Sequence, residues 1–467
     1  MGTARPQKKL LGTKELFSYS LGLFGFQLIV GYLNSYQAEF YVTAMKADLA
    51  VIGVLLLAVK ILSAVFDPVV GNLIDRTKSA KGKLKPFILY SALPLMIMTV
   101  VIFIQVPLTG ASLYIYIFFT FLLFSMAMTL GDVPSQAIAA VATPDPTERT
   151  NLVSVANTFK AVGLSAAAAV IPVVCLLVPG GSSVITQNGA PDTPISVSEY
   201  LVTAIVIAAA GCLLFMLIYF FNKERVPYKA EKMTFKDMLA VLKGNKPFML
   251  VILSCFLGFG RQIQTGIAVQ TANSVLNSQN LVLLLGLTGG IGAVISMALI
   301  PVLVKKFGEK RVYISLSLYG FAISMLTFFL GYKSLPVMLV FLFFTGFQFG
   351  VVDILPMIMT ADSVDYYEYK TGKRAEGTIY AVLSLTVKVT IAMGTALGLI
   401  ILSAAKYDAV ALKQDATTAN VVYFAYAAVP GIFSLLSVIP ILKYDLSGSK
   451  KLEIAAELQK RREASSL

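Results

Sequence analysis

Residues 49–75 read LAVIGVLLLAVKILSAVFDPVVGNLID, an apolar run that contains Asp67 followed directly by a proline. A second apolar run, Tyr114–Ala142, contains Asp132 close to another proline. An apolar run of about 18 residues or more is typical of a membrane-spanning helix. A charge at the centre of such a helix costs about 2.5–3.5 kcal/mol, and charges at that depth usually mark an ion or substrate pathway. The two aspartates therefore indicate a transporter.

The composition points to the same class and excludes others. Of the 467 residues, 57% are hydrophobic and only 13% are charged, against about 25% charged residues in a typical globular domain. The three cysteines all lie in apolar runs and there is no histidine, so neither a disulfide framework nor a metal site is expected. We expect no enzyme activity and no cofactor, because no nucleophile–base pair, metal motif or phosphate-binding loop occurs.

The positive charge is distributed as a membrane topology requires. The net charge is +13, but the basic residues cluster in short loops, which argues against nucleic acid as a partner. With the N-terminus inside, the cytoplasmic segments hold 30 of the 38 lysines and arginines, and the opposite loops hold four. This bias predicts a multi-pass protein of the cell membrane, embedded in the lipid bilayer, with both termini in the cytoplasm.

Twelve apolar segments predict an all-α membrane protein with twelve transmembrane helices in two six-helix halves. Paired halves are typical of secondary transporters, whose substrate site lies near the midplane between them. The predicted parts are an N-terminal half 1–221, a cytoplasmic central loop 222–246, a C-terminal half 247–443 and a tail 444–467 that includes a short amphipathic helix. The predicted spans are 16–43, 49–75, 86–107, 111–143, 152–178, 198–221, 247–272, 279–304, 312–332, 335–361, 376–404 and 419–442.

Polar side chains accompany both aspartates. Ser63 lies four residues before Asp67, and Thr129, Asp132 and Gln136 have similar spacing, so each set lies on one face of its helix. If these two spans face each other, they offer carboxylates and hydroxyls, the oxygen ligands that Na+ prefers. A carboxylate whose pKa is raised by desolvation could instead carry a proton. The predicted coupling ion is Na+ or H+, with no other metal.

The structural alternative is charge pairing. Asp67 lies two helical turns from Lys60, and Lys388 is another lysine within a span. Either lysine could neutralise an aspartate without any role in transport. Arg261 is also within a span, where it could contact an anionic substrate, pair with Asp353 or extend to the membrane interface.

The loop after the second span carries an ordered motif. Asp67 is followed by Gly71, then by Asp75 and Arg76, and then by several lysines. Gly71 would allow two helices to approach closely. Asp75 and Arg76, at a cytoplasmic helix end, could form inter-helix ion pairs that act as a gate. Anchoring by the positive-inside rule would explain the lysines but not this spacing.

The motifs together resemble those of the glycoside–pentoside–hexuronide:cation symporter family, within the major facilitator superfamily. The matching motifs span most of the chain in the expected order. They are the Asp67–Arg76 motif, Asp132-Val133-Pro134, Asp145-Pro146-x-Glu148-Arg149-x-x-Leu152, and the stretch Val364–Gly377 with its Asp-Tyr-x-Glu-x-Lys-Thr-Gly-x-Arg-x-Glu-Gly pattern.

The resemblance implies import of a sugar (a glycoside, pentoside or uronide) coupled to Na+, H+ or Li+ by alternating access. It implies a cation site at Asp67 and Asp132 with the hydroxyl of Thr129, to which the helical spacing adds the hydroxyl of Ser63. We expect a gate that includes Asp75, Arg76, Arg149 and Arg374. The implied sugar-binding residues are Gln27, Asn34, Asp132, Gln136, Asn157, Ser384 and Lys388.

The sequence departs from the family pattern at three positions. Ser63 stands where many sodium-coupled members have a second carboxylate, which favours H+ because a proton needs only one base. Gln27 and Gln136 replace an acid and a sugar-stacking aromatic residue of related galactoside carriers. Tyr32 and Tyr36 could supply stacking, although tyrosines at helical spacing more often serve packing.

Two other functions remain open from the sequence. The chain could carry lysolipids or other amphiphiles, as some members of the same superfamily do. It could also be a non-transporting membrane sensor, although such proteins usually carry an added signalling domain. We expect the protein to function as a monomer.

Overall fold

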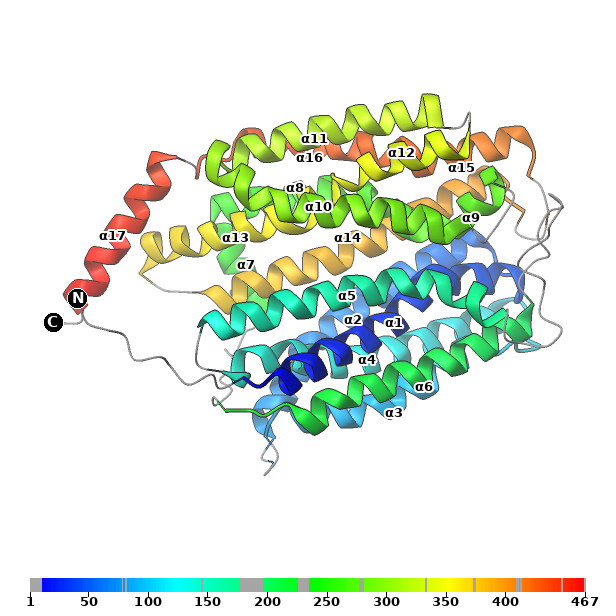
Figure 1. Ribbon diagram of the computed structural model, residues 1–467, viewed down its shortest axis with the longest axis horizontal. Coiled ribbons are helices and arrows are strands. Elements are labelled where there is room, and N and C mark those ends of the chain that lie inside the picture. Colours follow the sequence, from blue (N-terminus) through cyan, green and yellow to red (C-terminus); the bar gives the residue numbers. More distant parts are fainter. Residues whose placement is uncertain are drawn as a thin grey trace. The chain divides into compact units, whose positions relative to one another are not determined.

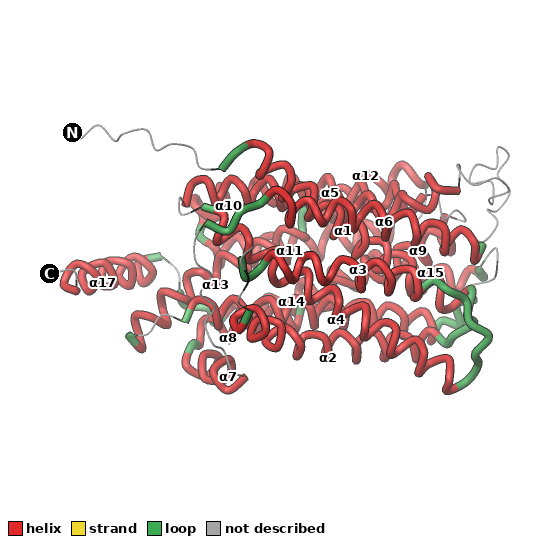
Figure 2. The backbone as a smooth tube through the Cα atoms, turned by 90° about the horizontal axis from the view of Figure 1, so that it is seen from below, coloured by secondary structure: helices red, strands yellow, loops and turns green. Residues whose placement is uncertain are grey.

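The computed structural model describes residues 11–77, 79, 82–143, 146–175, 196–225, 235–276, 281–331, 334–372, 375–408, 411, 414–446 and 448–465. Over these ranges every regular element is a helix (Figure 2). In a bilayer a helix satisfies all its own backbone hydrogen bonds, which is why long apolar runs adopt it. The all-helical prediction is confirmed for these residues.

The chain forms two compact units by its internal contacts. Unit 1 comprises Met1–Phe40, Val65–Gly181 and Ile195–Ala230, and unit 2 comprises Tyr41–Ala64, Ser182–Pro194 and Glu231–Leu467. Helices α1 to α6 (Figure 1) are α1 (Thr13–Thr43), α2 (Leu49–Arg76), α3 (Lys85–Ile102), α4 (Ala111–Ala142), α5 (Pro146–Cys175) and α6 (Val197–Phe221). The first sixteen residues of α2 belong to unit 2 and the remainder to unit 1.

Helix α1 packs closely against two neighbours in unit 1. A Cβ added at Gly25 would lie 2.6 Å from the carbonyl oxygen of Gly211 on α6. A Cβ added at Gly163 on α5 would lie 2.6 Å from the carbonyl oxygen of Phe24. Only glycine permits these backbone approaches. By contrast, a Cβ at Gly71 would meet nothing within 4 Å, so the structure does not support the predicted close approach there.

An aromatic cluster fills the core where α1, α3 and α6 meet. Tyr32, Tyr36, Phe40, Phe103 and Tyr200 are all at most 2% exposed. Phe103 lies 4.7 Å from Tyr32 and 5.2 Å from Phe40, centroid to centroid. The Tyr32 hydroxyl donates to the Tyr200 carbonyl at 2.8 Å. The two tyrosines considered for sugar stacking therefore serve packing in this structure.

Unit 2 contains shorter and more interrupted helices. Helix α7 meets α8 at 104°, and α8 is separated from α9 by a 3₁₀ turn. A π-helical turn follows α11. The elements are α7 (Phe235–Gly244), α8 (Lys246–Leu257), η1 (Phe259–Gln262), α9 (Ile263–Leu276), α10 (Val282–Phe307), α11 (Glu309–Leu326), η3 (Thr327–Gly331), α12 (Leu335–Gly346), α13 (Phe349–Thr371), α14 (Glu376–Ala404), α15 (Ala416–Ala427), α16 (Val429–Leu442) and α17 (Ser449–Ser465).

These interruptions affect the count of spans. Within the described ranges, nine helices are long and apolar enough to cross a membrane, or ten if the bent pair α7–α8 is one span. The predicted tenth span coincides with two pieces, α12 and α13, that meet at Phe347–Gln348. The structure supports a polytopic all-helical fold, and the number twelve stays a prediction.

Helix α17 confirms the predicted amphipathic helix of the tail. Its residues Ile454 and Leu458 are 5% and 4% exposed and join a core cluster with Leu355 and Met359 of α13. On the same helix, Lys451 forms a 2.6 Å ion pair with Asp362. The tail helix is therefore packed onto α13 rather than free.

Candidate functional site

The polar face of α4 is formed as its spacing predicts. The Gln136 side-chain amide donates to both carboxylate oxygens of Asp132 at 2.9 Å. Asp132 is half-buried, whereas Thr129 one turn earlier is 5% exposed. A side-chain amide N–H is a donor that suits a carboxylate acceptor. This part of α4 therefore presents a hydrogen-bonded carboxylate on a mostly apolar helix.

The polar residues of α2 are also placed on one helix, four residues apart. Asp67 is half-buried and Ser63 is 8% exposed. The Ser63 hydroxyl donates to the Lys60 carbonyl at 3.0 Å, which leaves its oxygen lone pairs available to a cation. A shared ion between Asp67 and Asp132 stays a prediction.

The other predicted sugar-binding residues differ in exposure. In unit 1, Asn34, Gln136 and Asn157 are exposed and Gln27 is half-buried. In unit 2, Ser384 is exposed and Lys388 is half-buried, both on α14. Polar groups of this kind on apolar helices suit a substrate pathway, and their contact with a sugar stays a prediction.

The predicted gate residues are only partly described. Arg76 is exposed at the end of α2, and Arg149 donates to the Thr143 carbonyl at 3.3 Å. The Asp75 side chain and all of Arg374 lie outside the described residues. The gate role stays a prediction for all four.

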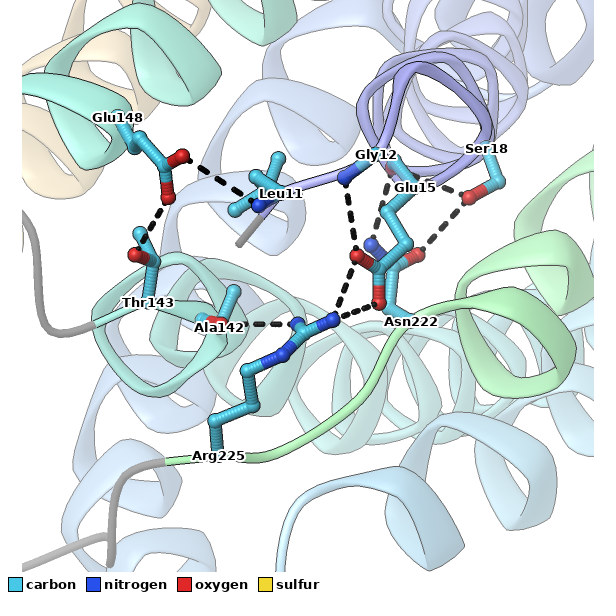
Figure 3. Close-up of polar contacts among 9 residues, drawn as sticks. All are labelled: Leu11, Gly12, Glu15, Ser18, Ala142, Thr143, Glu148, Asn222 and Arg225. Carbon is cyan, nitrogen blue, oxygen red and sulfur yellow. Dashed lines mark hydrogen bonds and ion pairs between the residues drawn. The ribbon is translucent and has the colours of Figure 1, made fainter. Parts of the chain in front are cut away.

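One end of unit 1 carries a polar network that the sequence analysis missed (Figure 3). Arg225 forms an ion pair with Glu15 at 2.8 Å and donates to the Ala142 carbonyl at 3.0 Å. Its backbone N–H also donates to the Val141 carbonyl at 2.8 Å. Asn222, which is 1% exposed, donates to the Glu15 carbonyl at 3.0 Å. The segment after α6 thus joins the start of α1 to the end of α4.

Two more glutamates complete this network at helix starts. Glu224 accepts the backbone N–H groups of Lys83 at 2.9 Å and of Leu84 and Lys85 at 3.0 Å, at the start of α3. Glu148, in the first turn of α5, accepts the Leu11 N–H and the Thr143 hydroxyl. A carboxylate at a helix N-terminus is favourable because it meets unpaired N–H groups and the positive end of the helix dipole.

A local signal could have revealed this network. Glu15, Glu148 and Glu224 are acids at helix ends, where the positive-inside pattern explains only the basic residues. Two of them lie in the first turn of their own helix, which is a recognised helix-start signal. Glu224 lies 140 residues from Leu84, so its pairing could not be read from spacing.

Arg261 of unit 2 is enclosed within that unit. It is 2% exposed, and its guanidinium donates to the Gly258 carbonyl, the Tyr313 hydroxyl and the Ser437 hydroxyl at 3.2–3.4 Å. Among the described side chains no carboxylate lies within ion-pair distance of it. Arg261 is thus solvated by oxygen atoms, in the break between α8 and α9.

The hydroxyl hydrogens around Arg261 are all directed away from it. Ser254 donates to the Ser437 carbonyl at 2.9 Å, and the Ser437 hydroxyl donates to the Ser434 carbonyl at 2.7 Å. The Tyr313 hydroxyl has two acceptors for its hydrogen, the Ser254 hydroxyl at 2.6 Å and the Ser437 hydroxyl at 3.2 Å. The oxygen lone pairs of Tyr313 and Ser437 then face the guanidinium. This order favours a structural role over contact with an anionic substrate, and the Asp353 side chain lies outside the described part.

No group of three or more metal-ligating side chains gathers within the described ranges. A coupling role for Asp67 and Asp132 stays a prediction. Long apolar helices that carry half-buried carboxylates are typical of a polytopic membrane transporter.

Comparison with known proteins identifies its family. The model of the MFS/sugar transport protein family matches residues 18–448, so the chain belongs to this family. The glucuronide carrier protein homolog of Escherichia coli (strain K12) is 29% identical over 459 residues, which cover 97% of this chain and 96% of that protein. The isoprimeverose transporter of Lactiplantibacillus pentosus is 26% identical, covering 98% and 94%.

The relatives confirm the resemblance to glycoside–pentoside–hexuronide:cation symporters, and a putative glycoside/cation symporter of E. coli is also among them. The protein is therefore a sugar symporter of the membrane and not an enzyme. The solved structure of the nucleoside transporter NupG is similar with a TM-score of 0.61 and 17% sequence identity. The match covers 93% of this chain and 100% of that chain. That likeness shows the fold alone.

Proposed function

We propose that Asp67 and Asp132 carry the coupling cation of this symporter, and that the cation is H+ or Na+. The observation that carries the proposal is a half-buried Asp132 whose two oxygens accept one amide on an apolar helix. Ser63 and Thr129 would add hydroxyl oxygens. Ser63 in place of a second carboxylate favours H+, because a proton needs only one base.

The proposed substrate is a sugar that bears a uronate or a pentose unit. The names of two relatives, a glucuronide carrier homolog and an isoprimeverose transporter, support this class. Amide, hydroxyl and ammonium groups suit the hydroxyls and carboxylate of such sugars. The proposed sugar-binding residues are Gln27, Asn34, Asp132, Gln136, Asn157, Ser384 and Lys388.

The proposed cycle is alternating access in twelve spans, with the cation entering first and neutralising the aspartates. Inward movement of one positive charge gains about 2.3 kcal/mol per 100 mV. That energy supports roughly 50-fold accumulation of the sugar before any ion gradient is added. Asp75, Arg76, Arg149 and Arg374 are the proposed gate.

We also propose that the protein is a monomer of the inner or plasma membrane with both termini in the cytoplasm. The basic residues at one set of helix ends, 30 of 38, support this orientation. Reporter fusions at each terminus would test it, since a reporter active only outside the cytoplasm should stay inactive at both ends.

The deciding experiment is uptake into proteoliposomes with an imposed H+ or Na+ gradient, over a panel of glycosides, pentosides and uronides. Asp67→Asn and Asp132→Asn should each abolish accumulation of the sugar. The Asp67→Asn protein should still exchange sugar across the membrane. Asp415→Asn is the matched control, because Asp415 is an exposed helix cap outside the spans and Asn caps about as well. Unaltered accumulation in both variants would contradict the coupling role, and no uptake of any sugar would contradict the substrate class.

A further inference from the structure

The interrupted helices of unit 2 leave backbone carbonyls without their normal partners. In a helix each carbonyl accepts the N–H four residues on. Pro430 lies four residues after Tyr426 and has no N–H to donate. The Phe347 carbonyl also lacks the N–H of Val351, because that group donates to Gln348 at 3.0 Å. An unsatisfied group of this kind costs several kcal/mol in a bilayer.

Side chains of neighbouring helices donate to backbone carbonyls at these interruptions. The Gln264 amide of α9 donates to the Tyr426 carbonyl at 3.0 Å, within the buried core. Ser296 of α10 donates to the Phe347 carbonyl at 2.7 Å. Tyr423 of α15 donates at 2.6 Å to the carbonyl of Thr327, the first residue of the π-helical turn. Each donor therefore comes from a helix other than the one that is interrupted.

The contact of Gln264 differs from the others because it joins two interruptions. Gln264 is the second residue of α9, directly after the 3₁₀ turn η1 that ends α8. Its partner Tyr426 is the second-to-last residue of α15, and α16 starts at Val429. Both side chains are buried, at 7% and 5% exposure. Tilting of α9 at its break would therefore pull on the break between α15 and α16.

We propose that Gln264 is a positioning residue whose amide replaces the N–H that Pro430 lacks, and so fixes the bend between α15 and α16 to the start of α9. The breaks in these two helices then change shape together during transport. The kinetic part of this inference rests on the proposed transport cycle, whereas the structural part does not.

A double-mutant cycle tests the replacement directly. Pro430→Ala restores a backbone N–H at position 430, which can donate to Tyr426 and make Gln264 dispensable. Gln264→Leu keeps the volume and removes the donor. In purified full-length protein, Gln264→Leu should lower Tm by about 2–6 °C with Pro430 present. The loss should be about a third of that or less in the Pro430→Ala background.

Transport measurements separate positioning from substrate contact. Gln264→Leu should lower the maximal uptake rate by roughly threefold to tenfold, with KM changed less than about twofold. Pro430→Ala should restore the rate of the Gln264→Leu protein. Ser274→Ala is the matched control on α9, because among the described residues its hydroxyl bonds to Gln270 of the same helix. Pro430→Gly offers the same N–H should the alanine variant not fold.

Equal Tm losses in both backgrounds would overturn the replacement. A large rise in KM would make Gln264 a substrate contact, and an unchanged maximal rate would overturn the positioning role. If the unsubstituted protein transports no sugar, the proposed function fails, while the Tm cycle still decides whether Gln264 replaces the N–H of Pro430.

Discussion

Arg225 and Glu15 form a 2.8 Å ion pair across 210 residues of sequence. Both guanidinium and carboxylate are partly shielded, with side chains 25% and 13% exposed. The guanidinium also donates to the end of α4. The pair therefore joins the first helix of unit 1 to the segment after α6.

Replacing Arg225 should destabilise the protein moderately. Arg225→Ala removes the ion pair and the donor to Ala142, and we expect a loss of about 1–2 kcal/mol, reduced by the remaining exposure of the pair. Arg225→Lys keeps the charge but loses the forked geometry, so it should recover only part of this stability. Thermal unfolding of the purified variants measures both. Equal stability of Arg225→Ala and the unsubstituted protein would contradict the structural role.

Replacing Glu224 should loosen the start of α3. Glu224→Ala leaves the N–H groups of Lys83, Leu84 and Lys85 without their carboxylate, so their amide hydrogen exchange should accelerate roughly tenfold or more. Gly82→Ala should act in the same direction, because its Cβ would collide with the Glu224 carboxylate and its φ is +103°. Mass spectrometry of peptides from this loop reports the exchange. Peptides from α10 in unit 2 are the internal control and should not change.

Two substitutions at Arg261 and its neighbour Gly258 should differ in how strongly they destabilise the protein. Arg261→Met removes the buried charge and leaves hydroxyls whose hydrogens are already bonded, so we expect a loss of about 1 kcal/mol or less. Gly258→Ala keeps the charge but places a Cβ in collision with the Arg261 guanidinium, so it should cost at least about 2 kcal/mol. Thermal unfolding compares them. Selective loss of uronide uptake by Arg261→Met would instead place Arg261 at the substrate.

The tail helix should detach when its apolar contact is shortened. Leu458 is 4% exposed against α13, and Leu458→Ala should cost about 2–3 kcal/mol of local stability. Limited trypsin digestion at the lysines and arginines of α17 should therefore accelerate. Glu453→Ala, on the exposed face of the same helix, should leave the digestion rate unchanged. The same rate in both variants would show that α17 is not held by this contact.

The sequence predicts the class of fold well because hydrophobic runs and loop charge act locally. It also identifies Asp67 and Asp132, because a charge within an apolar run is visible without any partner. It does not predict the breaks near Gly258 and Ala428, which depend on donors from other helices. Nor does it predict the role of Glu224, because the capped helix start lies far away in sequence and the surrounding lysines suggest only membrane anchoring.

The carboxylate of Glu224 has a consequence for biogenesis. The start of α3 is made 140 residues before its cap, which at about 5–20 residues per second is about 7–28 s of synthesis. During that interval the N–H groups of Lys83 to Lys85 must be satisfied by water or by the translocation machinery. The N-terminal helices can therefore complete these contacts only after Glu224 and Arg225 leave the ribosome. Formation of the contacts is thus a late step of membrane insertion.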